Sequence, residues 1–158
     1  MWIKGIYIDG YGIFHNFCVE NTVPGLNVFF GSNEAGKTTL MHFLNCILFG
    51  FERNSTAGDF HEPLQGGEHG GRVVVVTEAG REYVVARHTT KKNTAPPVVT
   101  GVDGLPLEGK IFQNILGNLS KKTYVNIFSF GIDELNQIAA LQGSELEAQL
   151  YSAGYTGR

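Results

Sequence analysis

Residues 28–51 read "VFFGSNEAGKTTLMHFLNCILFGF". A short apolar run ends at Gly31, a turn of small and polar residues follows, and a second apolar run begins after Lys37. The apolar side chains that recur in this second run are Leu40, Phe43, Leu44, Ile47 and Leu48. Their spacing of three and four residues predicts a helix with one buried stripe, which Gly50 is placed to end. The stretch therefore predicts a strand, a glycine-rich turn and a helix, in that order.

The turn carries a phosphate-binding pattern. Residues 31–38 satisfy G-x-x-x-x-G-K-[ST], and the flanking strand and helix are the setting in which backbone amides converge on phosphate oxygens at a helix N-terminus. The residues expected to bind the nucleotide are Asn33, Glu34, Ala35, Gly36, Lys37, Thr38 and Thr39. Lys37, the predicted catalytic residue, would place its charge between the β- and γ-phosphates, and the Thr38 hydroxyl would ligate Mg²⁺. Thr39 would contact the α-phosphate. The sequence thus predicts a P-loop that binds ATP with Mg²⁺.

Short β-rich runs surround this motif. Three strands are predicted before the helix, over residues 3–8, 14–20 and 26–30. Residues 52–71 have no period and are rich in glycine and polar side chains, which predicts a surface insertion. A hairpin over residues 72–88, with its turn at Gly80, and a strand over residues 97–102 follow.

The last third of the chain mixes both patterns. A helical stripe runs over residues 111–119, and the run "TYVNIFSF" predicts a buried extended segment that ends at Gly131. Ser144 and Glu147 form a capping box that predicts the start of another helix.

Composition narrows the class of protein. The 158 residues are 42% hydrophobic and 17% charged, as expected for one compact domain. The net charge is -3, and the clusters of basic residues are too short to form an autonomous nucleic-acid surface. Cys18 and Cys46 predict reduced, buried thiols rather than a disulfide scaffold or metal site. The start of the chain is not a secretory signal, and its longest apolar run is too short to cross a membrane. A cytoplasmic protein is expected.

Three stretches also carry a family resemblance: "NEAGKTTL" with the later "LFGF", the opening "IYIDGYGIFHNF", and "GGRVVVV" with "EYVVARH". The chain resembles, over nearly its whole length, the N-terminal lobe of SMC-like and RecN-like ABC-type ATPase heads, closest to the YhaN family. In such proteins a long coiled coil and a C-terminal lobe with the remaining catalytic motifs follow.

The resemblance implies several site residues. Asn33 to Thr39 would bind phosphate and Mg²⁺, and Arg87 would correspond to an arginine that recurs in this lobe, with a solvated strand-end arginine as the alternative. Tyr11 or Phe14 could touch the adenine, although an aromatic between strands is more often part of the core. The family's metal-ligating glutamine is replaced by Phe130 at the best-matching place, so that Asp133, Glu134 or Gln137 substitutes or the site works without it.

Several patterns imitate sites without the required context. Asp9 precedes the phosphate loop and is interpreted as a turn residue, while Asp133 and Glu134 are interpreted as acids at a helix N-terminus. "LQGGE", residues 64–68, imitates an ABC signature but leads into a strand instead of opening a helix. A set of possible metal ligands in the insertion comprises Asp59, His61, Glu62, Glu68 and His69. Their spacing matches no zinc site, which favours a solvated loop.

The predicted fold is α/β, the N-terminal half of an ABC/SMC-type P-loop head, with a mixed sheet and an antiparallel hairpin around the P-loop helix. Residues 1–158 would form this lobe, with residues 52–71 as an insertion and without the coiled coil and C-terminal lobe. The chain alone would be a monomer that binds ATP without turnover, and the full-length ATPase would act in DNA repair or maintenance, with DNA and a nuclease as possible partners. A self-sufficient small P-loop kinase and a non-hydrolysing nucleotide-sensing module are the alternatives.

Overall fold

A computed structural model describes residues 1–51, 61–89 and 96–129 of the chain. It forms two compact units, Met1–Phe112 and Gln113–Arg158. The capping box at Ser144, and with it Phe130, Asp133, Glu134 and Gln137, lies outside the described residues.

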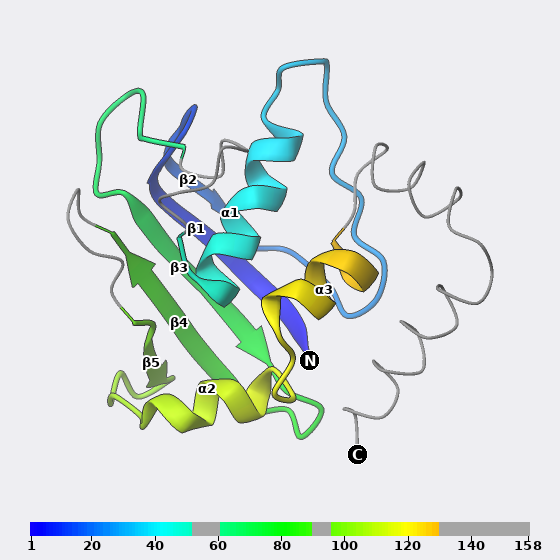
Figure 1. Cartoon of the computed structure of the whole chain (residues 1–158), viewed down its shortest axis with the longest axis vertical. Coiled ribbons are helices and arrows are strands. Elements are labelled where there is room, and N and C mark those ends of the chain that lie inside the picture. The colour runs from blue at the N-terminus through cyan, green and yellow to red at the C-terminus, as the bar shows by residue number, and fades with distance from the viewer. Residues whose placement is uncertain (52–60, 90–95, 130–158) are drawn as a thin grey trace. The chain divides into compact units, whose positions relative to one another are not determined.

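The first unit is built on a five-stranded sheet (Figure 1). Its strands are β1 (Trp2–Tyr11), β2 (Phe14–Val19), β3 (Gly70–Val76), β4 (Glu82–His88) and β5 (Val98–Gly101). Their order is β2-β1-β3-β4-β5, and every neighbouring pair is antiparallel. The predicted strands over residues 3–8, 14–20 and 97–102, and both strands of the hairpin with its turn at Gly80, are therefore confirmed.

Helix α1 (Lys37–Phe49) lies across one face of this sheet (Figure 1). Phe43 and Ile47 are fully buried on its sheet-facing side, and Val73, Val75 and Val85 are fully buried on β3 and β4. Burying one such side chain contributes about 1.5–3 kcal/mol, so this layer holds α1 firmly in place. The predicted amphipathic helix and fold class are confirmed, and Gly50 ends the helix by donating its N–H to the carbonyl of Cys46.

The strand predicted over residues 26–30 does not form. This segment has no regular secondary structure, and its apolar side chains lie in solvent, with Leu26 87% and Phe30 93% exposed. A strand needs a neighbour that satisfies its backbone and covers its side chains, and no described strand pairs with this segment. The β-rich pattern correctly identified residues that favour a strand, but the prediction of a formed strand was wrong.

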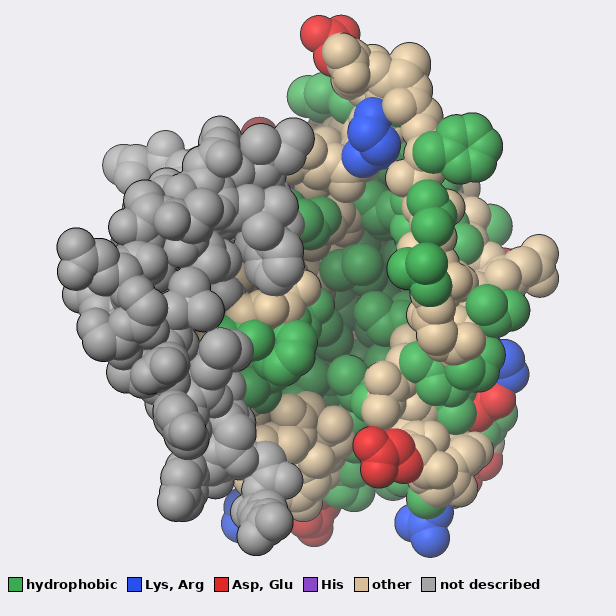
Figure 2. Space-filling view, turned by 90° about the vertical axis from the view of Figure 1, so that its right-hand side faces the viewer, with side chains coloured by type: hydrophobic (Ala, Val, Ile, Leu, Met, Phe, Trp, Pro, Cys, Tyr) green, Lys and Arg blue, Asp and Glu red, His purple; other side chains and the backbone are tan. Residues whose placement is uncertain are grey.

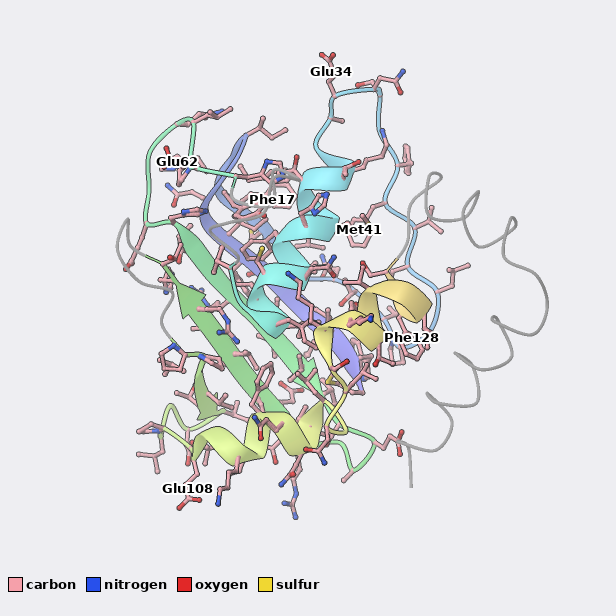
Figure 3. All side chains as sticks on the ribbon, in the orientation of Figure 1. Phe17, Glu34, Met41, Glu62, Glu108 and Phe128 are labelled. Atoms are coloured by element: carbon pink, nitrogen blue, oxygen red, sulfur yellow. The ribbon has the colours of Figure 1, made fainter. Side chains whose placement is uncertain are left out.

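The expected extended segment after residue 120 is also wrong. It is helix α3 (Lys121–Phe128), because Ser120 caps its first turn by accepting the N–H of Thr123 at 3.1 Å. Tyr124 and Phe128 are four residues apart, and their rings meet at 6.0 Å, so the apolar run follows the helical period. The labelled Phe128 marks the end of α3 in Figure 3.

Helix α2 (Gly109–Ile115) is shorter than the predicted 111–119 stripe. Gly117 and Asn118 have φ of 64° and 55°, and this left-handed backbone cannot continue a right-handed helix. None of the helices in the described ranges has the length and apolar character needed to cross a bilayer. Cys18 and Cys46 form no disulfide; Cys46 is buried as expected, whereas Cys18 is exposed.

Candidate functional site

The phosphate loop, residues 31–36, rises from the exposed segment and enters α1 at Lys37. Glu34 and Gly36 adopt the left-handed region, with φ of 68° and 89°, which turns the chain sharply into the helix. Ala35 donates its N–H to the carbonyl of Ser32 at 3.3 Å. Figure 3 labels Glu34 at the tip of the loop, pointing away from α1. The loop thus presents its backbone at the N-terminal end of the helix.

Lys37 folds back over this loop. Its Nζ donates to the carbonyls of Gly31 at 2.8 Å and Ser32 at 2.7 Å. The helix ladder begins with the bond from the Leu40 N–H to the Gly36 carbonyl, so the amides of the first turn point beyond the helix N-terminus. An ammonium group and helix N-terminal amides therefore converge at the loop, and a phosphate fits this donor set.

The two threonines after Lys37 lie on the first turn of α1. Thr38 is exposed and Thr39 is partly exposed. A hydroxyl is an oxygen ligand of the kind that Mg²⁺ takes. Lys37, Thr38 and Thr39 thus follow the loop in the order that the motif requires, and Asn33, Glu34 and Ala35 lie in its exposed part.

The turn between β1 and β2 packs against the phosphate loop and the first turn of α1. A Cβ on Gly36 would lie 2.7 Å from Ile13 Cδ1 and 2.8 Å from Phe14 Cζ, and one on Gly12 would lie 2.9 Å from Thr39 Cγ2. These distances are shorter than ordinary contacts, and both residues have positive φ, 54° at Gly12 and 89° at Gly36, so a side chain is disfavoured at either position. Sequence reasoning missed this contact, because "DGYG" predicts a turn without indicating what packs against it.

The two aromatic candidates for adenine contact have different surroundings. Tyr11 is fully buried and stacks edge-on against Phe43, so it belongs to the core. Phe14 is half-buried beside Gly36, and its ring lies 4.6 Å from that of Phe17. Phe17 is labelled in Figure 3 near the N-terminal part of α1. Of the pair, only Phe14 lies at the phosphate loop.

Arg87 is buried, so its interpretation as a solvated strand-end arginine was wrong. Only 9% of it is exposed, and its Nε donates to the carbonyl of Ile47 at 3.1 Å. Desolvation lowers the pKa of the guanidinium, and the nearby Cys46 partly opposes this effect. Arg87 therefore holds the C-terminal turn of α1 onto β4.

The structure shows where two of the sequence patterns that imitate sites lie. Asp9 is not a turn residue: it lies within β1, where its carboxylate meets His88 Nε2 at 2.8 Å. Residues 64–68 open no helix and lead into β3, which confirms that the "LQGGE" stretch is not a signature.

The described members of the possible metal cluster, His61, Glu62, Glu68 and His69, do not form a metal site. Among the residues that the structure describes, no group of three or more potential ligands could hold a metal ion, and Asp59 lies outside them. Glu62 and Glu68 are exposed, as a solvated loop requires. His61 and His69 instead pack on the Tyr11 ring, at 5.3 and 5.6 Å between centroids. Burial lowers the pKa of His69, against the opposing effects of Glu62 and the His61 backbone.

Comparisons with known proteins agree with this geometry. A family model described as "AAA domain" matches residues 1–154. The chain is 30% identical over 153 residues to the uncharacterized protein YhaN of Bacillus subtilis (strain 168), covering 96% of this chain and 15% of that protein. A solved chain from work on ATP-driven dimerization and DNA-stimulated activation of SMC ATPases is 16% identical, with a TM-score of 0.66 over 95% of this chain and 98% of the other. The chain thus spans about 15% of the length of the curated relative it matches.

Proposed function

This chain belongs to the family of AAA domains and has the fold of an SMC-type ATPase head lobe, and we propose that it binds ATP with Mg²⁺ as one half of a composite ATPase site. The observation that carries this proposal is the phosphate loop itself. Lys37 Nζ and the amides of the first turn of α1 lie together at the loop, and the exposed Thr38 follows Lys37 in that turn. Lys37 would bind the β- and γ-phosphates, and the amides would bind the charge that they carry. Bound Mg²⁺ would neutralise further charge on the phosphates.

A second lobe is needed to complete the site. Residues 26–30 present apolar side chains to solvent, and Figure 2 shows hydrophobic side chains along this face of the molecule. The side of α1 that carries Met41 and Leu44 is only partly buried, so apolar side chains outside its sheet-facing side are available to a second layer. We infer that a C-terminal lobe of the full-length protein supplies strands beside residues 26–30 and covers this side of α1.

The proposed turnover depends on that lobe. Within the described residues no strand after the phosphate loop ends in a carboxylate able to orient water: β3 ends at Val76, β4 at His88 and β5 at Gly101. The 158-residue chain should therefore bind ATP as a monomer without hydrolysing it. A non-hydrolysing sensor would stay inactive when the C-terminal lobe is added, which separates that alternative. The fully antiparallel sheet disfavours a self-sufficient kinase.

The setting of the complete enzyme follows from its relatives. Because the SMC ATPases of the structural match are described as dimerizing with ATP and responding to DNA, we propose a cytoplasmic role in DNA repair or maintenance, with a nuclease as a possible partner. The net charge of -3 disfavours an autonomous DNA-binding surface on this lobe.

Thermal unfolding with and without Mg-ATP tests nucleotide binding. At 100 times the dissociation constant, the ligand should stabilise the fold by about 2.7 kcal/mol. For a chain of this size that raises the melting temperature by roughly 5–10 °C, and Lys37→Ala should remove most of the shift. A wild-type melting curve that millimolar Mg-ATP does not move would refute the proposal.

A further inference from the structure

Residues 61–65, which we name the brace, are bonded to the turn between β1 and β2. The Gly12 N–H donates to the His61 carbonyl at 3.1 Å, and the Leu64 N–H donates to the Gly12 carbonyl at 2.9 Å. Gln65 Nε2 adds a bond to the Ile13 carbonyl at 3.2 Å. Glu62, labelled in Figure 3, lies within the brace. Two backbone bonds and one side-chain bond therefore fix this turn from the side of the insertion.

The same turn touches the phosphate loop on its other side. Gly12 lies so close to Thr39 that a Cβ would come within 2.9 Å of its methyl group. Ile13 and Phe14 leave no room for a side chain at Gly36. Thr39 and Gly36 stand on either side of Lys37 and Thr38, so the turn contacts both ends of the nucleotide-binding residues. Any shift of the turn is passed to them, because close-packed contacts transmit displacement.

We propose that the brace and the β1–β2 turn position the phosphate loop for nucleotide binding. This inference rests on the proposed function of the loop, and it assigns a role to the described part of the insertion. The brace holds Gly12 in place, and Gly12 in turn fixes the position of Thr39. Neither element belongs to the residues proposed to bind the nucleotide, so both would act through the loop as positioning residues. The donors of the loop are then preorganised, so that less conformational entropy is lost when the nucleotide binds.

Gly12→Ala is the first test, and Gly80→Ala is its matched control. Both glycines have positive φ, 54° and 73°, so alanine strains the backbone at either site. A Cβ at Gly80 meets nothing within 4 Å, whereas one at Gly12 meets Thr39. Calorimetric titration should show Mg-ATP binding about tenfold weaker for Gly12→Ala, because the displaced loop misaligns charge-assisted bonds. Gly80→Ala should lower the melting temperature of the free chain while leaving the affinity unchanged.

Removal of the Thr39 methyl tests the contact directly. Thr39→Ser keeps the hydroxyl but deletes Cγ2, the atom that a Cβ at Gly12 would strike. Adding Gly12→Ala to Thr39→Ser should therefore weaken binding by less than threefold, compared with about tenfold in the wild-type background. The melting temperature should not recover in the double variant, since the strain at residue 12 remains. Losses of affinity that simply multiply would overturn the positioning role of Gly12.

The brace is tested by Leu64→Pro and Leu64→Ala. Proline removes the N–H that bonds to Gly12, while alanine keeps it and trims a side chain that is 75% exposed. Affinity for Mg-ATP should fall about threefold or more in Leu64→Pro and stay unchanged in Leu64→Ala. Equal affinities for both variants would overturn the role of the brace. If Leu64→Pro does not fold, Gln65→Ala, which removes the bond to Ile13, replaces it with the same expectation. A wild-type chain that fails to bind Mg-ATP would refute the proposed function, and the positioning role with it.

Discussion

Replacing Arg87 with alanine is expected to destabilise the fold without changing the nucleotide site. The substitution leaves the Ile47 carbonyl without its donor in a buried place, which costs about 1–3 kcal/mol. It also removes a cation from the C-terminal end of α1, which contributes about 0.3–1 kcal/mol. The loss of roughly 3 kcal/mol should lower the melting temperature by roughly 6–12 °C for a chain of this size.

Two measurements separate a structural role for Arg87 from a nucleotide-binding one. Arg72→Ala is the matched control, since Arg72 is exposed and only stacks over the Tyr7 ring at 4.4 Å, a contact worth about 0.5–1 kcal/mol. Ile47 lies ten positions after Lys37, roughly 15 Å along the helix axis, so Arg87→Ala should leave the Mg-ATP affinity within threefold. Melting temperatures that fall equally in the two variants, or an affinity loss confined to Arg87→Ala, would refute the reasoning.

Three further outcomes are expected. Thr38→Ala should weaken ATP binding far more in Mg²⁺ than in EDTA, while Thr38→Ser stays near wild type, because the hydroxyl is proposed as the metal ligand; equal losses in both conditions would contradict that role. Burial lowers the pKa of His69 in the folded chain. The unfolded chain therefore binds a proton at His69 at a higher pH than the folded chain does, and stability should fall as pH drops below about 6.5. The free energy of unfolding, measured by denaturant titration, should fall less steeply at acid pH in His69→Leu than in the wild-type chain. An identical dependence on pH in both chains would count against the lowered pKa. The purified chain should show only background ATP hydrolysis, whereas addition of the C-terminal lobe should yield ATP-dependent dimers and turnover that Lys37→Ala abolishes. Robust hydrolysis by the chain alone would contradict the composite site.

The sequence alone determined the features that depend on local patterns. The spacing of Leu40, Phe43 and Ile47 predicted the sheet-facing side of α1, because the helical period fixes which side chains share a face. The glycine and lysine of the phosphate loop predicted its place at a helix N-terminus, since only that arrangement brings backbone amides together. The consecutive valines in residues 73–76 and 84–85 predicted β3 and β4, because β-branched side chains favour strands.

Tertiary structure decided the features that depend on contacts between segments of the chain. Residues 26–30 have the composition of a strand, but backbone pairing needs a neighbour, and none of the described strands provides one. Residues 123–130 were predicted to be extended, but the Ser120 cap and the pairing of Tyr124 with Phe128 place residues 121–128 in a helix. Burial of Arg87 depends on the distance between β4 and the end of α1, which no local pattern records. The support that Gly12 gives to Thr39 joins residues 27 positions apart, and only the folded chain brings them into contact.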